Sequence, residues 1–293
     1  LMLYNEAFLS IENLMEYLNM YELDHICAET TLYLGRNDLK EMINTPISNH
    51  YTENMEQALF KNVVSDIKEH HKEYYSLYQQ LSDLDSQNTL FELIKFRLAP
   101  LSSFLSDIYS FKMAYLDNNI LQLKKEGVVI DYGDSPDVYV NYFQSIYPDY
   151  KELIIYSRDK NICDICRNNL TEIPHLKIVC AGLGSKAVHL KLPNPINPKV
   201  MDELTVDVLD DAVKDSLSFL RINANGQEQD VLLGAKQHIK NNKPAIAICV
   251  GNTVSALWKI PKLLSAISSD YHFHLKHYSM SSICDTVLYA IAD

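Results

Sequence analysis

The sequence predicts an α/β fold: a doubly wound, mostly parallel sheet with an antiparallel last strand, preceded by a helical amino-terminal region. Before about residue 127, apolar residues recur at helical spacing, whereas from Val128 short apolar runs alternate with segments of helical period. In addition, the last two candidate strands lie too close in sequence for a crossover helix, so they should pair antiparallel. We therefore expect a helical region over residues 1–126 and an α/β domain over residues 127–293.

The amino-terminal region contains three helical patterns. Leu9–Leu18 carries the first, and Glu53–Leu81 carries a longer apolar stripe. Such a stripe needs a partner surface, which is either the α/β domain or a second copy of the chain. A homo-oligomer formed through these helices is therefore one expectation. Ser82-Asp83 is typical of a helix N-cap and precedes a predicted helix over Asp85–Leu98.

The second part of the chain alternates strands and helices of the lengths found in α/β proteins. Because strands alternate with helices, most of the strands should be parallel, with helices on both faces of the sheet. A loop with three prolines is expected over the carboxyl edge of the sheet. Strands are predicted at Val128–Asp131, Leu153–Tyr156, Lys177–Cys180, Val188–Leu192, Ser218–Ile222, Ala245–Val250, Tyr271–Leu275 and Thr286–Ile291. Helices are predicted at Pro136–Ile146, Lys160–Leu170, Gln227–Asn241 and Val254–Ser268, and the loop prolines are Pro193, Pro195 and Pro198.

The stretch Val128–Val138 is the expected centre of this arrangement. A β-branched run leads into Asp131, Gly133 follows, and a helical pattern begins after Pro136. Ligands of open α/β sheets bind at such turns, outside the carboxyl end of a strand. A glycine lets the backbone approach the ligand there, and the following amides can face it. The alternative is an ordinary strand-to-helix connection without a ligand.

Composition excludes several classes of function. The formal net charge of −12 argues against nucleic acid as a main partner, because phosphate contacts need a basic surface. No apolar run reaches the roughly 18 residues of a transmembrane helix. The first residues lack a basic segment before an apolar one, so no signal peptide is expected. These features favour a cytoplasmic protein.

The six cysteines are scattered along the chain. Cys180 and Cys249 end predicted buried strands and are interpreted as small core residues. Cys163 and Cys166 form a C-x-x-C pair on a predicted helix, without a second pair at zinc spacing. Core packing is favoured over metal or redox use for both, so no metal site is expected. This cysteine usage suits a reducing cytoplasm.

Several segments resemble one known family. They are the helical lead-in from Tyr74 to Leu98, the acidic Leu209–Asp211, the stretch Leu220–Ala235, and the closing segments Lys243–Ser279 and Asp285–Ile291. Together they are similar to bacterial FkbM-family methyltransferases over about Tyr74–Ile291. The resemblance implies a class I methyltransferase fold, an S-adenosylmethionine cofactor, and O-methylation of a sugar or another hydroxylated small-molecule or glycan acceptor.

The resemblance assigns cofactor contacts to Asp131, Gly133, Asp134, Asp137, Ser157 and Asp159. The family's first motif, D-x-G-A-x-x-G-D, is matched here with one residue fewer and without its second glycine. Ser157 stands where the family has a glutamate that holds the ribose hydroxyls, and Asp159 is the nearest substitute. Asp134 and Asp137 could accept from the methionine ammonium or simply favour the helix N-terminus. The expected binding of S-adenosylmethionine is therefore weak or absent.

The acidic motif of the family, I-K-x-D-x-E-G-x-E, departs in the same way. Arg221 replaces the lysine, Asn223 the aspartate and Asn225 the glutamate, while Gly226 and Glu228 remain. An amide can hydrogen-bond a ligand but cannot act as a base near neutral pH. The catalytic residue is not assigned, and the candidates are Asn223, Asn225 and Glu228.

Two classes of function remain open on this basis. The first is an S-adenosylmethionine-dependent O-methyltransferase with unusual site residues. The second is a catalytically inactive methyltransferase-like protein that serves as a binding or assembly module. The fold cannot decide between them, because function depends on the site.

Overall fold

The computed structural model describes residues 52–98, 102–133, 135–193, 201–280 and 282–292. The predicted helix at Leu9–Leu18 and the candidate cofactor residue Asp134 lie outside these ranges. The chain forms two compact units. The first comprises Leu1–Ala114, Val250–Lys262 and His272–Leu288, and the second comprises Tyr115–Cys249, Leu263–Tyr271 and Tyr289–Asp293. The proposed division at residue 126 stays a prediction.

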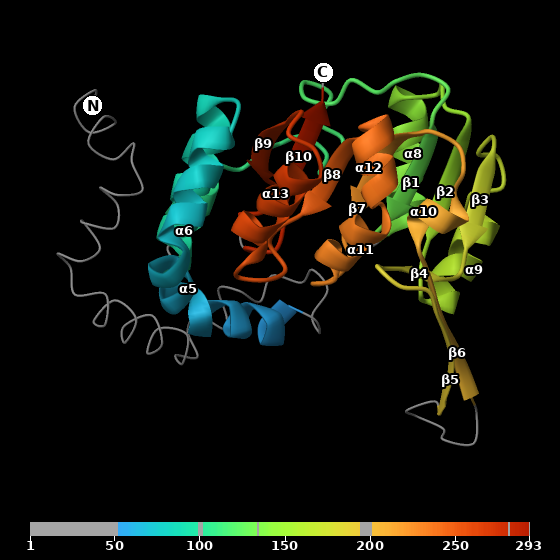
Figure 1. Ribbon diagram of the computed structural model, residues 1–293, viewed down its shortest axis with the longest axis horizontal. Helices are drawn as coiled ribbons and strands as arrows, with labels where there is room; N and C mark the ends of the chain where they lie inside the picture. The colour runs from blue at the N-terminus through green and yellow to red at the C-terminus, as the bar shows by residue number, and fades with distance from the viewer. Residues whose placement is uncertain (1–51, 99–101, 134, 194–200, 281, 293) are drawn as a thin grey trace. The chain divides into compact units, whose positions relative to one another are not determined.

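The principal sheet confirms the predicted fold class. Its seven strands have the order β3-β2-β1-β7-β8-β10-β9, mostly parallel with antiparallel final strands (Figure 1). The parallel pairs are β1 with β2 and β7, β2 with β3, and β7 with β8. The strands are β1 Val128–Tyr132, β2 Glu152–Tyr156, β3 Leu176–Val179, β7 Leu217–Ile222, β8 Ala245–Cys249, β9 Tyr271–His277 and β10 Thr286–Ala292.

Burial explains why these apolar runs form strands. All residues of β1, β7 and β8 are buried, as expected for parallel strands covered on both faces. Helix α8, Pro136–Ile146, places Phe143 against Phe219 of β7, with ring centroids 5.9 Å apart. Helix α9, Lys160–Asn169, follows β2 and packs beside α8 and β3.

The predicted helix over Gln227–Asn241 is instead two helices. Helix α11 spans Glu228–Gly234 and α12 spans Lys236–Asn242, with Ala235 between them outside helical geometry. A Cβ atom at Gly234 would lie 2.1 Å from the Gly184 carbonyl oxygen, so the chain passes very close to that backbone. Asp210 then accepts hydrogen bonds from the amides of Gln237 and His238 and caps the second helix.

The predicted strand Val188–Leu192 forms, but in a separate sheet. Here β5, Val188–Pro193, pairs antiparallel with β6, Met201–Asp207, and β6 pairs with the short β4, Gly182–Leu183. Figure 1 shows this hairpin extending away from the principal sheet of its unit. The placement of this strand in the main sheet was therefore wrong. Pro193 ends β5, while Pro195 and Pro198 lie outside the described residues.

The described residues of the first unit are mainly helical. It contains α5 Thr52–Gln80, α6 Leu84–Leu98, α7 Ser102–Ser106 and the larger part of α13, which spans Ala256–Ile267. Asp83 accepts from the Ser86 amide at 2.7 Å, which confirms the predicted cap. The apolar stripe of α5 is buried within this single chain, at Val63, Ile67, Tyr74 and Leu77. These four side chains are therefore buried without a second copy of the chain, and a homo-oligomer stays a prediction.

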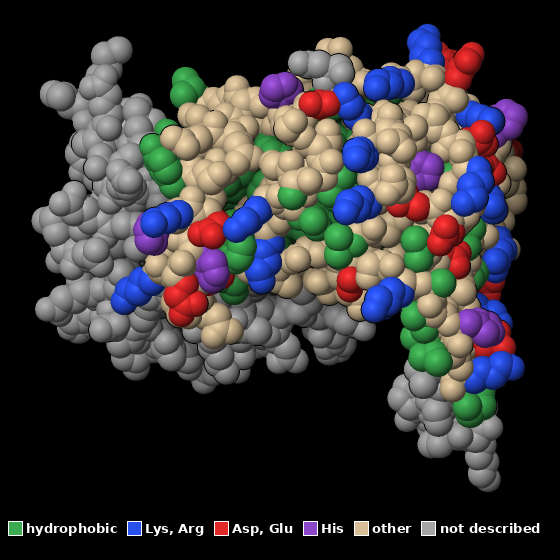
Figure 2. All heavy atoms as spheres, viewed as in Figure 1, with side chains coloured by type: hydrophobic (Ala, Val, Ile, Leu, Met, Phe, Trp, Pro, Cys, Tyr) green, Lys and Arg blue, Asp and Glu red, His purple; other side chains and the backbone are tan. Residues whose placement is uncertain are grey.

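The described surface carries both signs of charge. Figure 2 shows basic and acidic side chains interspersed on the face in view. Within the described ranges, no helix combines the length and the apolar character needed to cross a bilayer.

Candidate functional site

The candidate site lies where β1, β2 and β7 end. Tyr132 at the end of β1 is level with Tyr156 of β2 and Ile222 of β7. The segments that follow these strands therefore begin side by side at the carboxyl edge of the sheet. This edge is where ligands bind in open α/β sheets.

A buried ion pair dominates this edge. The Arg221 Nη1 donates to Asp131 Oδ1 at 2.6 Å, and both side chains are almost completely buried. The guanidinium carbon lies 4.1 Å from the ring centre of Tyr139 and 4.7 Å from that of Tyr115. Burial alone would lower the pKa of Arg221, but the charge of Asp131 and the two tyrosines raises it overall. Arg221 therefore stays charged, and Asp131 is directed to it.

The same guanidinium lies directly over the turn after β1. A Cβ atom at Gly133 would be 2.9 Å from Arg221 Cζ and 3.0 Å from each Nη atom. Position 133 therefore requires a glycine because the Arg221 side chain packs against it, without any ligand. A ligand that approached Gly133 from the side on which a side chain would project would meet Arg221.

Ser157 and Asp159 are held in the turn that opens α9. The Ser157 hydroxyl accepts from the Asp159 amide at 3.2 Å, and this side chain is largely buried. Asp159 is the N-cap of α9, because its carboxylate accepts from the Asn161 amide at 2.8 Å. Both side chains therefore stabilise local structure. Asp137 lies in the first turn of α8 and is half-buried.

The catalytic candidates meet in the turn between β7 and α11. Glu228 is buried and its Oε1 accepts from the amides of Ala224 at 3.1 Å and Gly226 at 3.2 Å. The backbone N–H of Asn223 donates to the Tyr132 carbonyl at 2.8 Å, which joins this turn to the end of β1. Asn225 is exposed and has a positive φ of 50°. Asn223 and Asn225 therefore lie in this turn, and the Glu228 carboxylate at the start of α11 holds the turn through two backbone amides.

This geometry predicts a stability effect for Glu228. Glu228→Ala removes the acceptor of two amides, which should lower the free energy of unfolding by about 1–3 kcal/mol. Glu228→Gln keeps a carbonyl oxygen at that place, so most of the loss should be avoided. Urea denaturation of both variants, with the exposed Gln229→Ala as control, measures the difference. Equal losses for the two Glu228 variants would show that the charge matters rather than the acceptor.

Comparison with solved structures identifies the fold. A methyltransferase FkbM from Methylobacillus flagellatus KT superposes with a TM-score of 0.68 at 20% identity, over 77% of this chain and 60% of that chain. The chain has a methyltransferase fold. Lower scores are found for a precorrin-6y C5,15-methyltransferase from Geobacter metallireducens GS-15 (TM-score 0.39, 14% identity, 63% of this chain and 93% of that chain). An rRNA methylase from Streptococcus thermophilus gives a TM-score of 0.37 at 12% identity, over 66% and 93% of the two chains. No family model and no curated protein matches the sequence.

The residues at the carboxyl edge of this methyltransferase fold do not fit S-adenosylmethionine. Asp131 is completely buried against Arg221, so it is not presented to a methionine ammonium. The guanidinium occupies the space above Gly133. The Ser157 hydroxyl is short, uncharged and already bonded in its own turn.

In the described part of the chain, no group of three or more His, Cys, Asp or Glu residues is arranged to hold a metal ion.

Sequence reasoning missed the most informative residue of the site. It noted Arg221 only as a replacement for lysine, and it did not consider Tyr115 or Tyr139. The available signal was positional, because Asp131 and Arg221 are the next-to-last residues of their strands. If those strands are neighbours, the two side chains become level at the same edge.

The interpretation of the cysteines is confirmed only in part. Cys166 and Cys249 are buried core residues as expected. Cys180 is exposed, and it forms a disulfide with the buried Cys163, so its assignment to the core was wrong. The strand β3 ends at Val179, which leaves Cys180 beyond the sheet.

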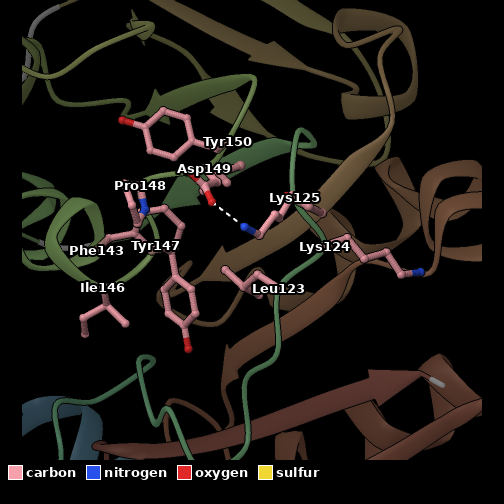
Figure 3. A pocket seen from close by; sticks show the side chains of 11 residues that line it. Leu123, Lys124, Lys125, Phe143, Ile146, Tyr147, Pro148, Asp149 and Tyr150 are labelled. Carbon is pink, nitrogen blue, oxygen red and sulfur yellow. Dashed lines mark ion pairs between the residues drawn. The ribbon is translucent and has the colours of Figure 1, made fainter.

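A cavity of about 280 Å³ lies away from the candidate site, at the opposite edge of the sheet. Val129 and Ser218, near the starts of β1 and β7, line it together with Phe143 at its apolar wall. Figure 3 shows Lys125 at its rim, where its Nζ pairs with Asp149 at 2.8 Å. Its lining includes none of the candidate cofactor or catalytic residues.

Proposed function

We propose that this chain is a catalytically inactive methyltransferase-like protein that serves as a binding or assembly module. One observation carries the proposal: the Arg221 guanidinium lies over Gly133 and is paired with the buried Asp131. Arg221 therefore occupies one side of the turn at which the cofactor would be expected to bind. Opening it would expose or strand a buried charge, which is costly.

The chemistry of methyl transfer supports the same proposal. Transfer to a hydroxyl group requires that the two reacting groups be positioned and, usually, that a base accept the hydroxyl proton. Asn223 and Asn225 are amides and cannot accept it. Glu228 is the one carboxylate among the candidates, and its Oε1 is held by two backbone amides.

The second candidate function is an S-adenosylmethionine-dependent O-methyltransferase acting on a sugar or another hydroxylated acceptor. The likeness to the FkbM methyltransferase, with a TM-score of 0.68, favours it. The strand, turn and helix around Gly133 also remain in place. The two candidates differ in the expected affinity for the cofactor.

Cofactor titration separates the two candidates. The wild-type chain should bind S-adenosylmethionine in the high micromolar range or worse. Arg221→Lys keeps a cation beside Asp131 but removes the planar group over Gly133, so it should tighten binding by about tenfold, or 1.4 kcal/mol. Ser157→Glu restores a carboxylate for the ribose hydroxyls and should give a gain of similar size, since hydrogen bonds to a charged group contribute about 1.5–3 kcal/mol.

Isothermal titration of the wild type and both variants measures these affinities. Ser145→Glu, at an exposed position of α8, is the matched control and should leave the affinity unchanged. Low-micromolar binding by the wild type, unimproved by either substitution, would contradict the inactive module and support the enzyme.

A further inference from the structure

Cys163 and Cys180, in the second unit, play no part in the proposed function. Cys163 lies in the first turn of α9 and Cys180 directly follows β3. The two are joined in a disulfide, with Cα atoms 6.0 Å apart, a separation within the usual range for disulfides. The third cysteine of this region, Cys166, remains a free buried thiol.

The two sulfur atoms have opposite surroundings. Cys163 is completely buried, whereas Cys180 is exposed to solvent. The Nη2 atom of Arg167 lies 3.1 Å from the Cys180 Sγ, and the same guanidinium is paired with Asp164 at 2.7 Å. A neighbouring cation favours the thiolate, which is the reactive form of cysteine. Cys180 is therefore both the accessible and the activated sulfur of the pair.

The surroundings of Cys163 contain an acceptor for its reduced form. Its Sγ lies 3.6 Å from the Ser157 carbonyl oxygen, within the distance at which a thiol donates a weak hydrogen bond. One buried position can thus hold either a disulfide sulfur or a satisfied thiol. This is expected of a pair that alternates between two redox states.

We propose that Cys163 and Cys180 form a reversible thiol–disulfide site that exchanges with low-molecular-weight disulfides such as oxidised glutathione, with Cys180 as the entry sulfur. The pair is a modification site whose exchange needs no cofactor. It therefore stands whether or not the chain binds S-adenosylmethionine.

The exchange balances in two steps. The Cys180 thiolate attacks one sulfur of oxidised glutathione, and the S–S bond breaks to release one glutathione thiolate. Cys163 then loses its proton to the solvent and attacks Cys180 of the mixed disulfide, which releases the second glutathione. The protein dithiol is oxidised and one glutathione disulfide is reduced to two thiols. In reverse, a glutathione thiolate attacks the exposed Cys180 sulfur and Cys163 is the leaving group.

Cys166 is a poor competitor in this exchange. Burial raises its pKa to about 11, and nearby Asp137 and Asp131 act in the same direction. Very little thiolate is then present at neutral pH. The neighbouring Cys166 therefore serves as an internal control for the pair.

Oxidation links α9 to the end of β3 beside the candidate site. The Ser157 amide donates to the Val179 carbonyl at 3.1 Å, next to the disulfide. The turn that contains Ser157 and Asp159 is therefore attached to the end of β3 by the Ser157 hydrogen bond before it and by the disulfide after it. The redox state of the pair should control how firmly this turn is held.

Alkylation in glutathione buffers tests the proposal on the full chain. After equilibration at different ratios of reduced to oxidised glutathione, free thiols are labelled and peptides are mapped by mass spectrometry. We expect one reversible link, Cys163–Cys180, that is lost in Cys180→Ser and kept in Cys166→Ser. In the reduced protein at pH 7, Arg167→Gln should slow alkylation of Cys180 by about three- to tenfold.

Two results would overturn the proposal. One is that both cysteines stay fully alkylatable in every glutathione buffer. The other is that the link forms but does not open under reducing glutathione. An unchanged alkylation rate in Arg167→Gln would refute Cys180 as the activated sulfur. The wild type and the exposed substitutions Cys180→Ser and Arg167→Gln carry these measurements, and Cys166→Ser, at a buried position, is used only as a control.

Discussion

Removing either member of the Asp131–Arg221 pair should lower the free energy of unfolding by about 3–5 kcal/mol. Both side chains are buried at the carboxyl edge of the sheet, and their atoms are 2.6 Å apart. Asp131→Ala leaves the guanidinium charge without its carboxylate in a low-dielectric site. Arg221→Ala leaves the carboxylate buried and removes the group that Tyr115 and Tyr139 face. Urea denaturation measures both losses.

A double variant tests whether the loss comes from the unpaired buried charge. Asp131→Leu combined with Arg221→Met removes both charges and keeps comparable volume, so it should recover most of the stability. The exposed pair Lys151–Asp215, at 2.7 Å, is the matched control. Asp215→Ala should cost no more than about 1 kcal/mol. A small loss in Asp131→Ala, like that of the control, would contradict a structural role for the buried pair.

Much of the fold could be predicted because the decisive information is local. The β-branched run from Val128 and the apolar run from Leu153 become buried strands within one residue of the expected bounds. The cap at Asp83 also depends on neighbouring residues alone. In each case, the residue types that form the element determine its place in the sequence.

The missed elements depend on distant contacts. The break between α11 and α12 follows from the approach of Gly234 to the carbonyl of Gly184, fifty positions earlier in the chain. The strand β6 has a mixed polar sequence, and it exists because Val188–Pro193 pairs with it. Neither contact can be deduced from the residues of the element itself.

The candidate site shows the same limit. The sequence correctly located the turn after β1 and the motif positions at the end of β7. It could not show that Asp131 and Arg221 are level in neighbouring strands, because that register is a property of the assembled sheet. The effect of arginine in place of lysine at position 221 depends on Gly133, because the guanidinium packs against that glycine. A substitution that looks conservative in sequence closes a turn in the structure.

The half-buried carboxylate of Asp66 in α5 should be important for the first unit. Asp66 accepts from the Tyr74 hydroxyl at 2.7 Å and from the Trp258 indole at 3.2 Å. Its charge also acts on the completely buried Arg97, whose pKa is lowered by burial. Asp66 therefore holds α5 to the start of α13 and balances a buried cation, so the helix is an integral part of its unit.

Asp66→Ala should accordingly lower the free energy of unfolding by about 2–4 kcal/mol, because it leaves the Tyr74 and Trp258 donors without their acceptor and removes a charge that favours the buried Arg97 cation. Asp66→Asn keeps an acceptor for Tyr74 or Trp258 but removes the charge, so its loss should be intermediate. The exposed Glu69→Ala, on the same helix, is the control and should change stability by no more than about 0.5 kcal/mol. Urea denaturation followed by Trp258 fluorescence reports on this unit directly, since it contains the only tryptophan. A loss in Asp66→Ala no larger than in Glu69→Ala would mean that α5 is attached without this carboxylate, and that its buried apolar stripe alone holds it.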